Sequence, residues 1–282
     1  MVQLHDSVDA AKHKGDPHAE RDQAVRESLD KIKNKLMVMS GKGGVGKTST
    51  SVNLAIALAR KGHKVGIMDV DLHGPDVPRM LGMQGLLEMN DHNKLKPMQY
   101  SGNLGAVSVE SLTQEKDSAI IWRGPIKYSA IQQFIADVEW GDLDFLLIDA
   151  PPGTGDEPLT IAQTISDAKA IVVTTPQEVA LADVRKSISF CRRVDMKIFG
   201  VVENMSGFVC PHCNEPVDIF GSGGGERTAK QLDLTFLGRV PMDPNMVKCG
   251  DKGVSFQKTY PDSPVTKAFQ SIATRMGSLL SE

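Results

Sequence analysis

The sequence predicts an α/β fold in which a mostly parallel sheet carries helices on both of its faces. Short apolar runs alternate with segments of helical period along most of the chain. A glycine-rich loop joins the first run to the first helical segment, and acidic residues follow two later runs. Strands that are apolar throughout must be buried on both faces, as they are in a parallel sheet between two helical layers.

The composition is that of a globular protein without a strong charge bias. The chain has 282 residues, 40% hydrophobic and 24% charged, with 32 basic against 35 acidic side chains and a net charge of −3. This balance gives no basic footprint, so we expect no nucleic-acid partner. No apolar run is long enough to span a bilayer and the start is too polar for a signal peptide, so we expect no membrane partner. Four cysteines are too few for a disulfide scaffold and favour a cytoplasmic location.

The chain divides into a short arm and one domain. Residues 1–34 carry many charges and few large apolar side chains. We expect them to be a mobile or loosely docked arm, helical at most over residues 24–33. Residues 35–282 are expected to form a single domain, with a cysteine-containing loop at about 205–220.

The expected elements follow from the period of the apolar residues. Apolar runs predict strands at Leu36–Met39, Val65–Met68, Phe145–Ile148, Ala170–Val173, Ile198–Val202 and Thr235–Leu237. Helical period predicts helices at Ser49–Arg60, Ile126–Val138, Leu181–Arg193, Glu226–Leu232 and Val265–Leu280. The less regular region from about 85 to 120 is expected to contribute an edge strand near Leu104–Val109.

The glycine-rich loop carries the first functional motif. Residues 41–48 fit G-x-x-x-x-G-K-[ST] at every fixed position, between a predicted strand and a predicted helix. Backbone N–H groups of such a loop surround phosphate oxygens, while Lys47 reaches the β and γ phosphates and Thr48 binds Mg²⁺. The loop is therefore expected to bind a nucleoside triphosphate through Gly41, Lys42, Gly43, Gly44, Val45, Gly46, Lys47, Thr48 and Ser49.

Acidic residues at two strand ends are expected to complete this site. Asp69 and Asp71 follow one predicted strand, and Asp149 follows another. The strand ends on the phosphate-loop edge are where an open α/β sheet binds its ligand. We expect Asp149 to hold Mg²⁺ and Asp69 to support the metal or the loop. The proline- and glycine-rich residues 150–157 are expected to sense the γ-phosphate.

A pair of cysteines forms the second functional motif. Cys210 and Cys213 lie two residues apart in a loop, so their thiolates can share a metal or a cluster. From the residues alone, an iron–sulfur cluster, zinc and a thioredoxin-like dithiol all stay open. Cys191 falls on the apolar face of a predicted helix, which indicates a core position, whereas Cys249 could be an accessory thiol. A two-fold dimer would instead bring two identical pairs together.

The phosphate loop resembles the deviant Walker A loop of the MinD/ParA/nitrogenase iron-protein class, because Lys42 adds a second lysine to it. The resemblance implies that Lys42 reaches the partner subunit's nucleotide in a dimer and that Asp71 orients the attacking water. Lys42, Lys47 and Asp71 are thus the expected catalytic residues. It also implies that Asn204 hydrogen-bonds adenine and that the loop of Pro241 frames the base.

Residues from about 35 to 280 as a whole resemble the Mrp/ApbC family of P-loop ATPases. The strings that carry the resemblance are Ser40–Thr48, residues 69–76, residues 122–125, Asp149–Asp156, residues 203–206 and the Cys210/Cys213 pair. The resemblance implies an ATP-hydrolysing homodimer that holds a [4Fe–4S] cluster between its subunits. Such a protein receives the cluster from an upstream donor and passes it to apo iron–sulfur proteins. Two alternatives remain: a MinD/ParA-like switch that positions a membrane or DNA partner, and a zinc-bridged regulatory ATPase.

Overall fold

The computed structural model describes residues 17–71, 74–112, 124–210, 212–213, 215–217 and 219–281. Within these ranges, eight strands form one sheet. In their order across it they are β10 (Phe236–Arg239), β7 (Lys197–Glu203), β6 (Lys169–Thr174), β1 (Ile32–Met39), β5 (Leu143–Asp149), β2 (Val65–Asp69), β4 (Leu104–Ser108) and β3 (Met98–Ser101). Of the expected motif residues, Leu72, His73, Trp122 and Arg123 lie outside the described residues.

Neighbouring strands of this sheet are parallel except for β3 and β4, which are antiparallel. The expected edge strand at Leu104–Val109 is therefore an inner strand, and the edge is β3. The apolar run of β4 is buried along its whole length, since β2 and β3 pair with its two edges and the apolar clusters on both faces of the sheet include its side chains. The partly polar β3 is only half-buried, as is typical of an edge.

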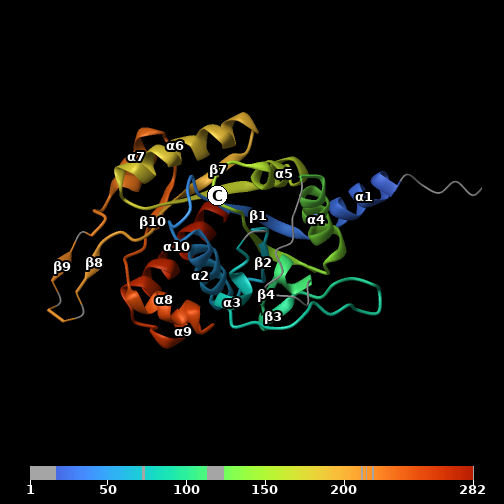
Figure 1. The fold of residues 1–282 in the computed structure, drawn as a ribbon, viewed down its shortest axis with the longest axis horizontal. Helices are drawn as coiled ribbons and strands as arrows, with labels where there is room; N and C mark the ends of the chain where they lie inside the picture. The colour runs from blue at the N-terminus through green and yellow to red at the C-terminus, as the bar shows by residue number, and fades with distance from the viewer. Residues whose placement is uncertain are drawn as a thin grey trace, which may run out of the picture.

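Helices lie on both faces of the sheet (Figure 1). They are α1 (Pro17–Leu29), α2 (Lys47–Arg60), α3 (Val77–Met80), α4 (Gly124–Asp137), α5 (Asp156–Thr164), α6 (Glu178–Arg193), α7 (Gly224–Gln231), α8 (Pro244–Asp251), α9 (Phe256–Thr259) and α10 (Pro264–Ser281). A short 3₁₀ helix follows β4 at Val109–Leu112. None of the helices in the described part of the chain combines the length and the apolar character that crossing a bilayer requires.

Strand β1 shows why two helical layers are needed. Leu36 and Val38 belong to one apolar cluster, which α2 and α10 complete, and Met37 and Met39 belong to a second, which α4, α5 and α6 complete. Alternate side chains of a strand point to opposite faces, so each face of this central strand requires its own cover.

The start of the domain lies before the expected boundary at residue 35. Strand β1 begins at Ile32, and helix α1 packs beside α4. Val25 and Leu29 of α1 are buried in the second apolar cluster. The part of the expected arm that the structure describes, residues 17–34, is thus a helix and a strand start docked on the body. Burial of these two apolar side chains provides the physical reason.

A two-stranded hairpin projects from the body at the lower left of Figure 1. Its strands are β8 (Phe208–Val209) and β9 (Pro216–Val217), which pair antiparallel. The hairpin begins five residues after the end of β7. It therefore leaves the sheet at the same edge as the phosphate loop, which follows β1.

Candidate functional site

The phosphate loop runs from the end of β1 into the first turn of α2. Gly46 is the residue before this helix and has φ of 79°, a left-handed conformation that glycine adopts without strain. A Cβ atom at Gly46 would also lie 2.3 Å from Nδ2 of Asn204. Similarly, a Cβ at Gly41 would lie 2.3 Å from the Asp183 carbonyl oxygen in α6. Both glycines are therefore needed for close approach of distant segments.

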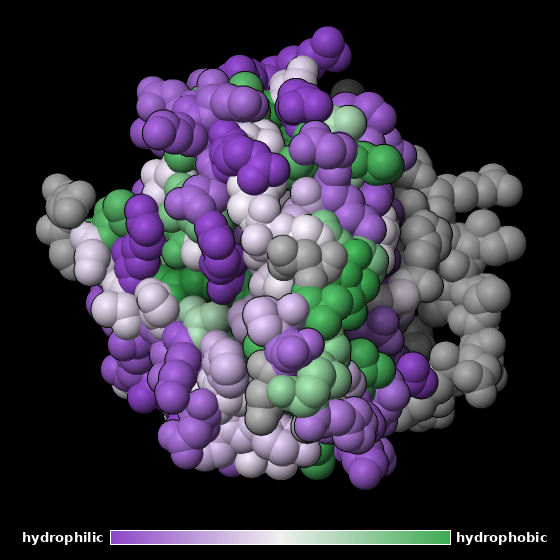
Figure 2. Space-filling model, turned by 90° about the vertical axis from the view of Figure 1, so that its left-hand side faces the viewer, coloured by the Kyte–Doolittle hydropathy of each residue, from purple (hydrophilic) through white to green (hydrophobic). Residues whose placement is uncertain are grey.

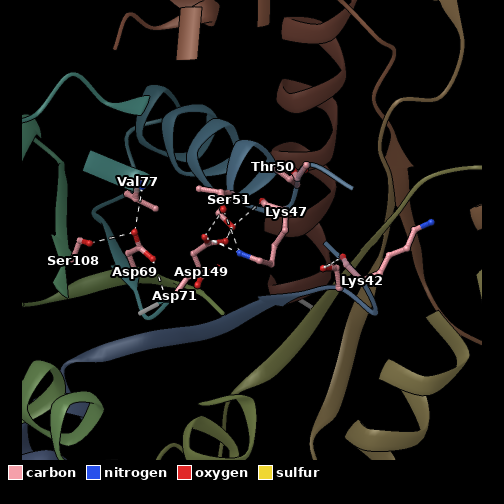
Figure 3. A network of polar contacts seen from close by, with 12 residues as sticks. Lys42, Lys47, Thr50, Ser51, Asp69, Asp71, Val77, Ser108 and Asp149 are labelled. Atoms are coloured by element: carbon pink, nitrogen blue, oxygen red, sulfur yellow. Dashed lines mark hydrogen bonds and ion pairs between the residues drawn. The ribbon is translucent and has the colours of Figure 1, made fainter. Parts of the chain in front are cut away.

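The carboxylate of Asp149 is the centre of a polar network at the end of β5 (Figure 3). It is fully buried and receives three contacts from α2: Thr48 Oγ1 at 2.8 Å, Ser51 Oγ at 2.6 Å and Lys47 Nζ at 2.9 Å. A buried carboxylate is stable only when it is paired and hydrogen-bonded, and Lys47 supplies the opposite charge. Asp149 and the hydroxyl of Thr48 are hard oxygen ligands of the kind that Mg²⁺ prefers.

Ser51 is a member of this network that the sequence analysis missed. It lies one helical turn after Lys47, and its hydroxyl also donates to the Lys47 carbonyl oxygen at 3.2 Å. The signal that would have found it is the i, i+4 spacing from the P-loop lysine on a helix facing the sheet.

Asp69 supports the loop that follows β2. It is fully buried and accepts hydrogen bonds from the backbone N–H groups of Asp71 and Val77, at 3.1 and 3.2 Å, and from Ser108 Oγ at 3.3 Å. Burial raises the pKa of Asp69 well above its usual range, and the nearby charge of Asp149 raises it further. Asp71 is half-buried at the mouth of the site.

Lys42 extends away from Lys47 and Asp149 (Figure 3). Its backbone carbonyl accepts the hydroxyl of Ser40 at 2.9 Å, which fixes the main chain at the start of the loop. The loop at 150–157 also contacts Ser40, since the N–H of Gly153 donates to the Ser40 carbonyl at 2.8 Å. The trans-acting role of Lys42 stays a prediction.

A pocket of about 630 Å³ opens beside the phosphate loop. Asn204 and Pro241, the two residues expected near the base, both line it together with Gly44, Gly46 and Ser49. The amide of Asn204 donates to the Val45 carbonyl oxygen at 2.9 Å, so this side chain also holds the loop. Four thioethers make much of the remaining wall: Met80, Met205, Met242 and Met246. These polarizable side chains suit the face of a planar aromatic base.

The cysteine pair lies in the turn of the projecting hairpin. Cys210 is half-buried and Cys213 is exposed. Hydrogen bonding from the backbone N–H groups of Cys213 and His212 lowers the pKa of the Cys210 thiol, so the turn favours a thiolate. Among the described residues, no group of three or more His, Cys, Asp or Glu side chains is arranged to hold a metal ion.

The other two cysteines are buried. Cys191 has no exposed surface and its Sγ lies 3.5 Å from Met39 Sδ, which confirms the expected core position. Burial raises the pKa of Cys191 to about 11. Cys249 is also buried, in α8, and burial raises the pKa of its thiol. The accessible thiols of the described chain are therefore the hairpin pair.

Exposed apolar residues lie in and next to the two strands of this hairpin. Val209, Val217 and Ile219 are 51%, 45% and 51% exposed, although valine and isoleucine are usually buried. Figure 2 views the molecule from the side on which the hairpin projects in Figure 1, and hydrophobic residues form patches on this face.

A family model described as the NUBPL iron-transfer P-loop NTPase of the ParA group matches residues 31–277. The chain belongs to this family. As a NUBPL-type P-loop NTPase, it is a nucleotide-binding protein.

Similar proteins are named as a carrier or an assembly factor of iron–sulfur clusters. The chain is 47% identical to an iron-sulfur cluster carrier protein of Methanocaldococcus jannaschii, over 92% of this chain and 89% of the relative. It is 46% identical to the cytosolic Fe-S cluster assembly factor CFD1 of Saccharomyces cerevisiae, over 88% of this chain and 89% of the relative.

Solved structures agree with the fold. A nucleotide-binding protein from Archaeoglobus fulgidus, in complex with ADP, is 37% identical to this chain, with a TM-score of 0.73. The match covers 82% of this chain and 91% of the Archaeoglobus chain. The cell division ATPase MinD of Pyrococcus furiosus is 23% identical, with a TM-score of 0.66 over 88% of this chain and 99% of its own. This NUBPL-type chain therefore has the P-loop ATPase fold of the MinD and ParA type.

Proposed function

We propose that this chain is an ATP-hydrolysing carrier of a [4Fe–4S] cluster that acts in the cytosol. Two copies hold the cluster between their Cys210/Cys213 pairs, receive it from an upstream donor and transfer it to apo iron–sulfur proteins. The names of relatives from two domains of life support the cargo, and the name of the yeast relative supports the location.

The observation that carries the proposal is the contrast between the four cysteines. Two are buried, whereas Cys210 and Cys213 lie in a projecting turn whose N–H groups favour a thiolate. A cubane cluster needs an anchor for each of four irons, and one chain offers two accessible thiols. A two-fold dimer supplies the other two, and the exposed Val209, Val217 and Ile219 provide apolar surface for it.

ATP hydrolysis at the nucleotide site drives the receipt and transfer of the cluster. Lys47 contacts the β and γ phosphates, and Thr48 and Asp149 hold Mg²⁺, which neutralises charge on the phosphates when it is bound. Asp71 orients the attacking water, and Lys42 of each copy reaches the nucleotide of the other. Asn204, Pro241 and the methionine-lined pocket accommodate adenine.

Anaerobic reconstitution with iron and sulfide tests the proposal. We expect broad visible absorption from iron–thiolate charge transfer and one cluster for two chains, measured by iron and sulfide analysis together with native mass spectrometry. Cys210→Ala and Cys213→Ala should each lose the cluster, whereas Cys191→Ala, the control, should keep it. Zinc in place of iron, one cluster per chain, or a cluster that survives loss of either hairpin cysteine would contradict the bridging carrier.

A further inference from the structure

Residues 203–208 connect the nucleotide pocket to the cysteine hairpin. At the nucleotide end, the amide of Asn204 donates to the Val45 carbonyl of the phosphate loop at 2.9 Å. The backbone N–H of Asn204 donates to the Thr174 carbonyl at 2.7 Å, at the end of β6. The segment is therefore hydrogen-bonded directly to the phosphate loop.

At its other end the same segment sets the base of the hairpin. Ser206 N–H donates to the Val240 carbonyl at 2.9 Å, and Met242 N–H donates to the Gly207 carbonyl at 2.8 Å. Phe208 then forms a bridge with Met242 and begins β8, which ends one residue before Cys210. The chain between Asn204 and Cys210 is thus short and hydrogen-bonded at both ends.

The buried carboxylate of Glu203 hydrogen-bonds this segment to the start of α7. Its carboxylate is fully buried and accepts the hydroxyl of Ser206, the N–H of Gly223 at 2.8 Å and the N–H of Gly225. The two glycine N–H groups lie at the start of α7, where the helix dipole also favours a negative charge. One carboxylate therefore joins the end of β7, the base of the hairpin and the start of α7.

The local backbone has little freedom to absorb a displacement. Met205 has φ of 55° and Gly207 has φ of 78°, so left-handed residues stand on both sides of Ser206. Met205 is a non-glycine residue in this conformation, which persists only where the surroundings hold it. The Ser206–Glu203 hydrogen bond lies between these two residues and ties the geometry of the segment to the buried carboxylate.

We propose that Glu203 is a positioning residue that makes the arrangement of the cysteine hairpin depend on the bound nucleotide, acting through Ser206. This inference rests on the proposed function, because it explains how the bound nucleotide could affect the cysteines that hold the cluster. A ligand shifts an equilibrium only if it binds two arrangements differently. Here the pocket residues Asn204 and Met205 belong to the segment that Glu203 holds, so nucleotide contacts bias the whole segment.

The test measures the reactivity of the hairpin thiols in protein without a cluster. Alkylation rates of Cys210 and Cys213 are followed by mass spectrometry of their peptides, with Mg²⁺ and either ADP or a non-hydrolysable ATP analogue. The wild type should show rates that differ about fivefold or more between the two nucleotides, the lower end of ordinary allosteric coupling. Nucleotide affinity is measured in parallel by calorimetry.

Ser206→Ala removes the hydroxyl that links the segment to Glu203 and leaves the carboxylate on the two glycine N–H groups. We expect it to retain nucleotide affinity within about twofold and to lose the nucleotide dependence of alkylation. Glu203→Gln should lose the same dependence. Ser187→Ala is the matched control, because Ser187 is fully buried and its hydroxyl contacts its own helix; it should behave as wild type.

Several outcomes would overturn the proposal. If the wild type binds nucleotide but its alkylation rates do not change with the nucleotide, the coupling alone is overturned. The same holds if Ser206→Ala keeps the full nucleotide dependence of alkylation. A wild type that binds no nucleotide would overturn both the coupling and the proposed ATPase. Cluster reconstitution is a separate measurement, so loss of the carrier function can be distinguished from loss of the coupling.

Discussion

Ser51 donates a hydrogen bond of 2.6 Å to Oδ1 of Asp149, while Thr48 occupies the other carboxylate oxygen, Oδ2, at 2.8 Å. Thr48 and Ser51 lie about one helical turn apart on one face of α2, and Asp149 is the last residue of β5. Consequently the helix that follows the glycine-rich loop also sets the orientation of the Asp149 carboxylate.

We predict that Ser51→Ala weakens both stability and Mg²⁺-dependent nucleotide binding. A buried carboxylate that loses one donor is destabilised by about 1–3 kcal/mol, and loss of its fixed orientation should weaken the Mg²⁺–nucleotide complex about tenfold. Denaturant unfolding and calorimetry with and without Mg²⁺ measure the two effects. Ser187→Ala, another fully buried serine, serves as the control. Equal behaviour of the two variants would remove Ser51 from the site.

The two lysines of the phosphate loop should differ in their effects. Lys47 contacts Asp149 within the site, whereas Lys42 extends away from it. Lys47→Ala should abolish tight nucleotide binding, and it should also destabilise the protein because Asp149 is left buried without its counter-charge. Lys42→Ala should keep most of the binding and lose hydrolysis or nucleotide-driven dimer contact. Calorimetry, phosphate release and analytical ultracentrifugation separate these cases, and variants that match in all three would argue against a trans-acting Lys42.

Asp71→Asn should slow hydrolysis about 100-fold or more with little change in ATP affinity. An amide keeps the size of the side chain but orients water poorly, while the backbone N–H of Asp71 still donates to Asp69. Single-turnover phosphate release and equilibrium ATP binding test this pair of expectations. Full turnover in a folded Asp71→Asn protein would exclude the residue from the chemical step.

Asp144 gives a prediction about pH. The Lys33 ammonium at 2.8 Å and the Lys64 backbone N–H at 2.9 Å hold the pKa of Asp144 below its usual range. A lowered folded-state pKa contributes stability above the unfolded pKa, about 3.9, and that contribution is lost as pH falls through the folded pKa. Asp144→Asn should therefore destabilise the protein by at most about 1 kcal/mol at neutral pH, because solvent screens an ion pair with the exposed Lys33, and progressively less below about pH 4.

Thermal unfolding of wild type and Asp144→Asn across this pH range measures the difference. The exposed Asp142 lies two positions earlier and provides the control, since Asp142→Asn should change stability little at any pH. A penalty for Asp144→Asn that stays constant to low pH would show that the ion pair does not contribute.

Much of the fold could be predicted because its strands are apolar on both faces. Ala170–Val173 lies within β6 and Val65–Met68 within β2, since short runs of this kind, alternating with helical segments, favour buried strands. The start of β1 could not be predicted, because Lys33 and Lys35 interrupt its apolar pattern. Their charges are accommodated by Asp144 and Asp167, both at 2.8 Å, and no local pattern reveals partners more than 100 positions away.

The candidate site also contains residues that could be predicted from the sequence and residues that could not. The phosphate loop is encoded by a continuous string, so its position after a strand could be predicted. Ser51 lies outside this string, and Glu203 begins the string at residues 203–206, which assigns it no role. Each acquires its role from segments distant in the sequence. Asn204 shows an intermediate case: its place beside the pocket could be predicted, but its hydrogen bond to Val45 follows from the packing of two loops.

The central position of β1 has a consequence for biosynthesis. This strand is made early but lies between β5 and β6, and Thr48 meets Asp149 only 101 positions later in the chain. At ordinary translation rates that interval lasts about 5–20 s. Throughout it, the nascent chain carries this central strand with both of its edges open. Newly made chains are therefore most vulnerable to aggregation, and most in need of a chaperone, before the ribosome has completed β5.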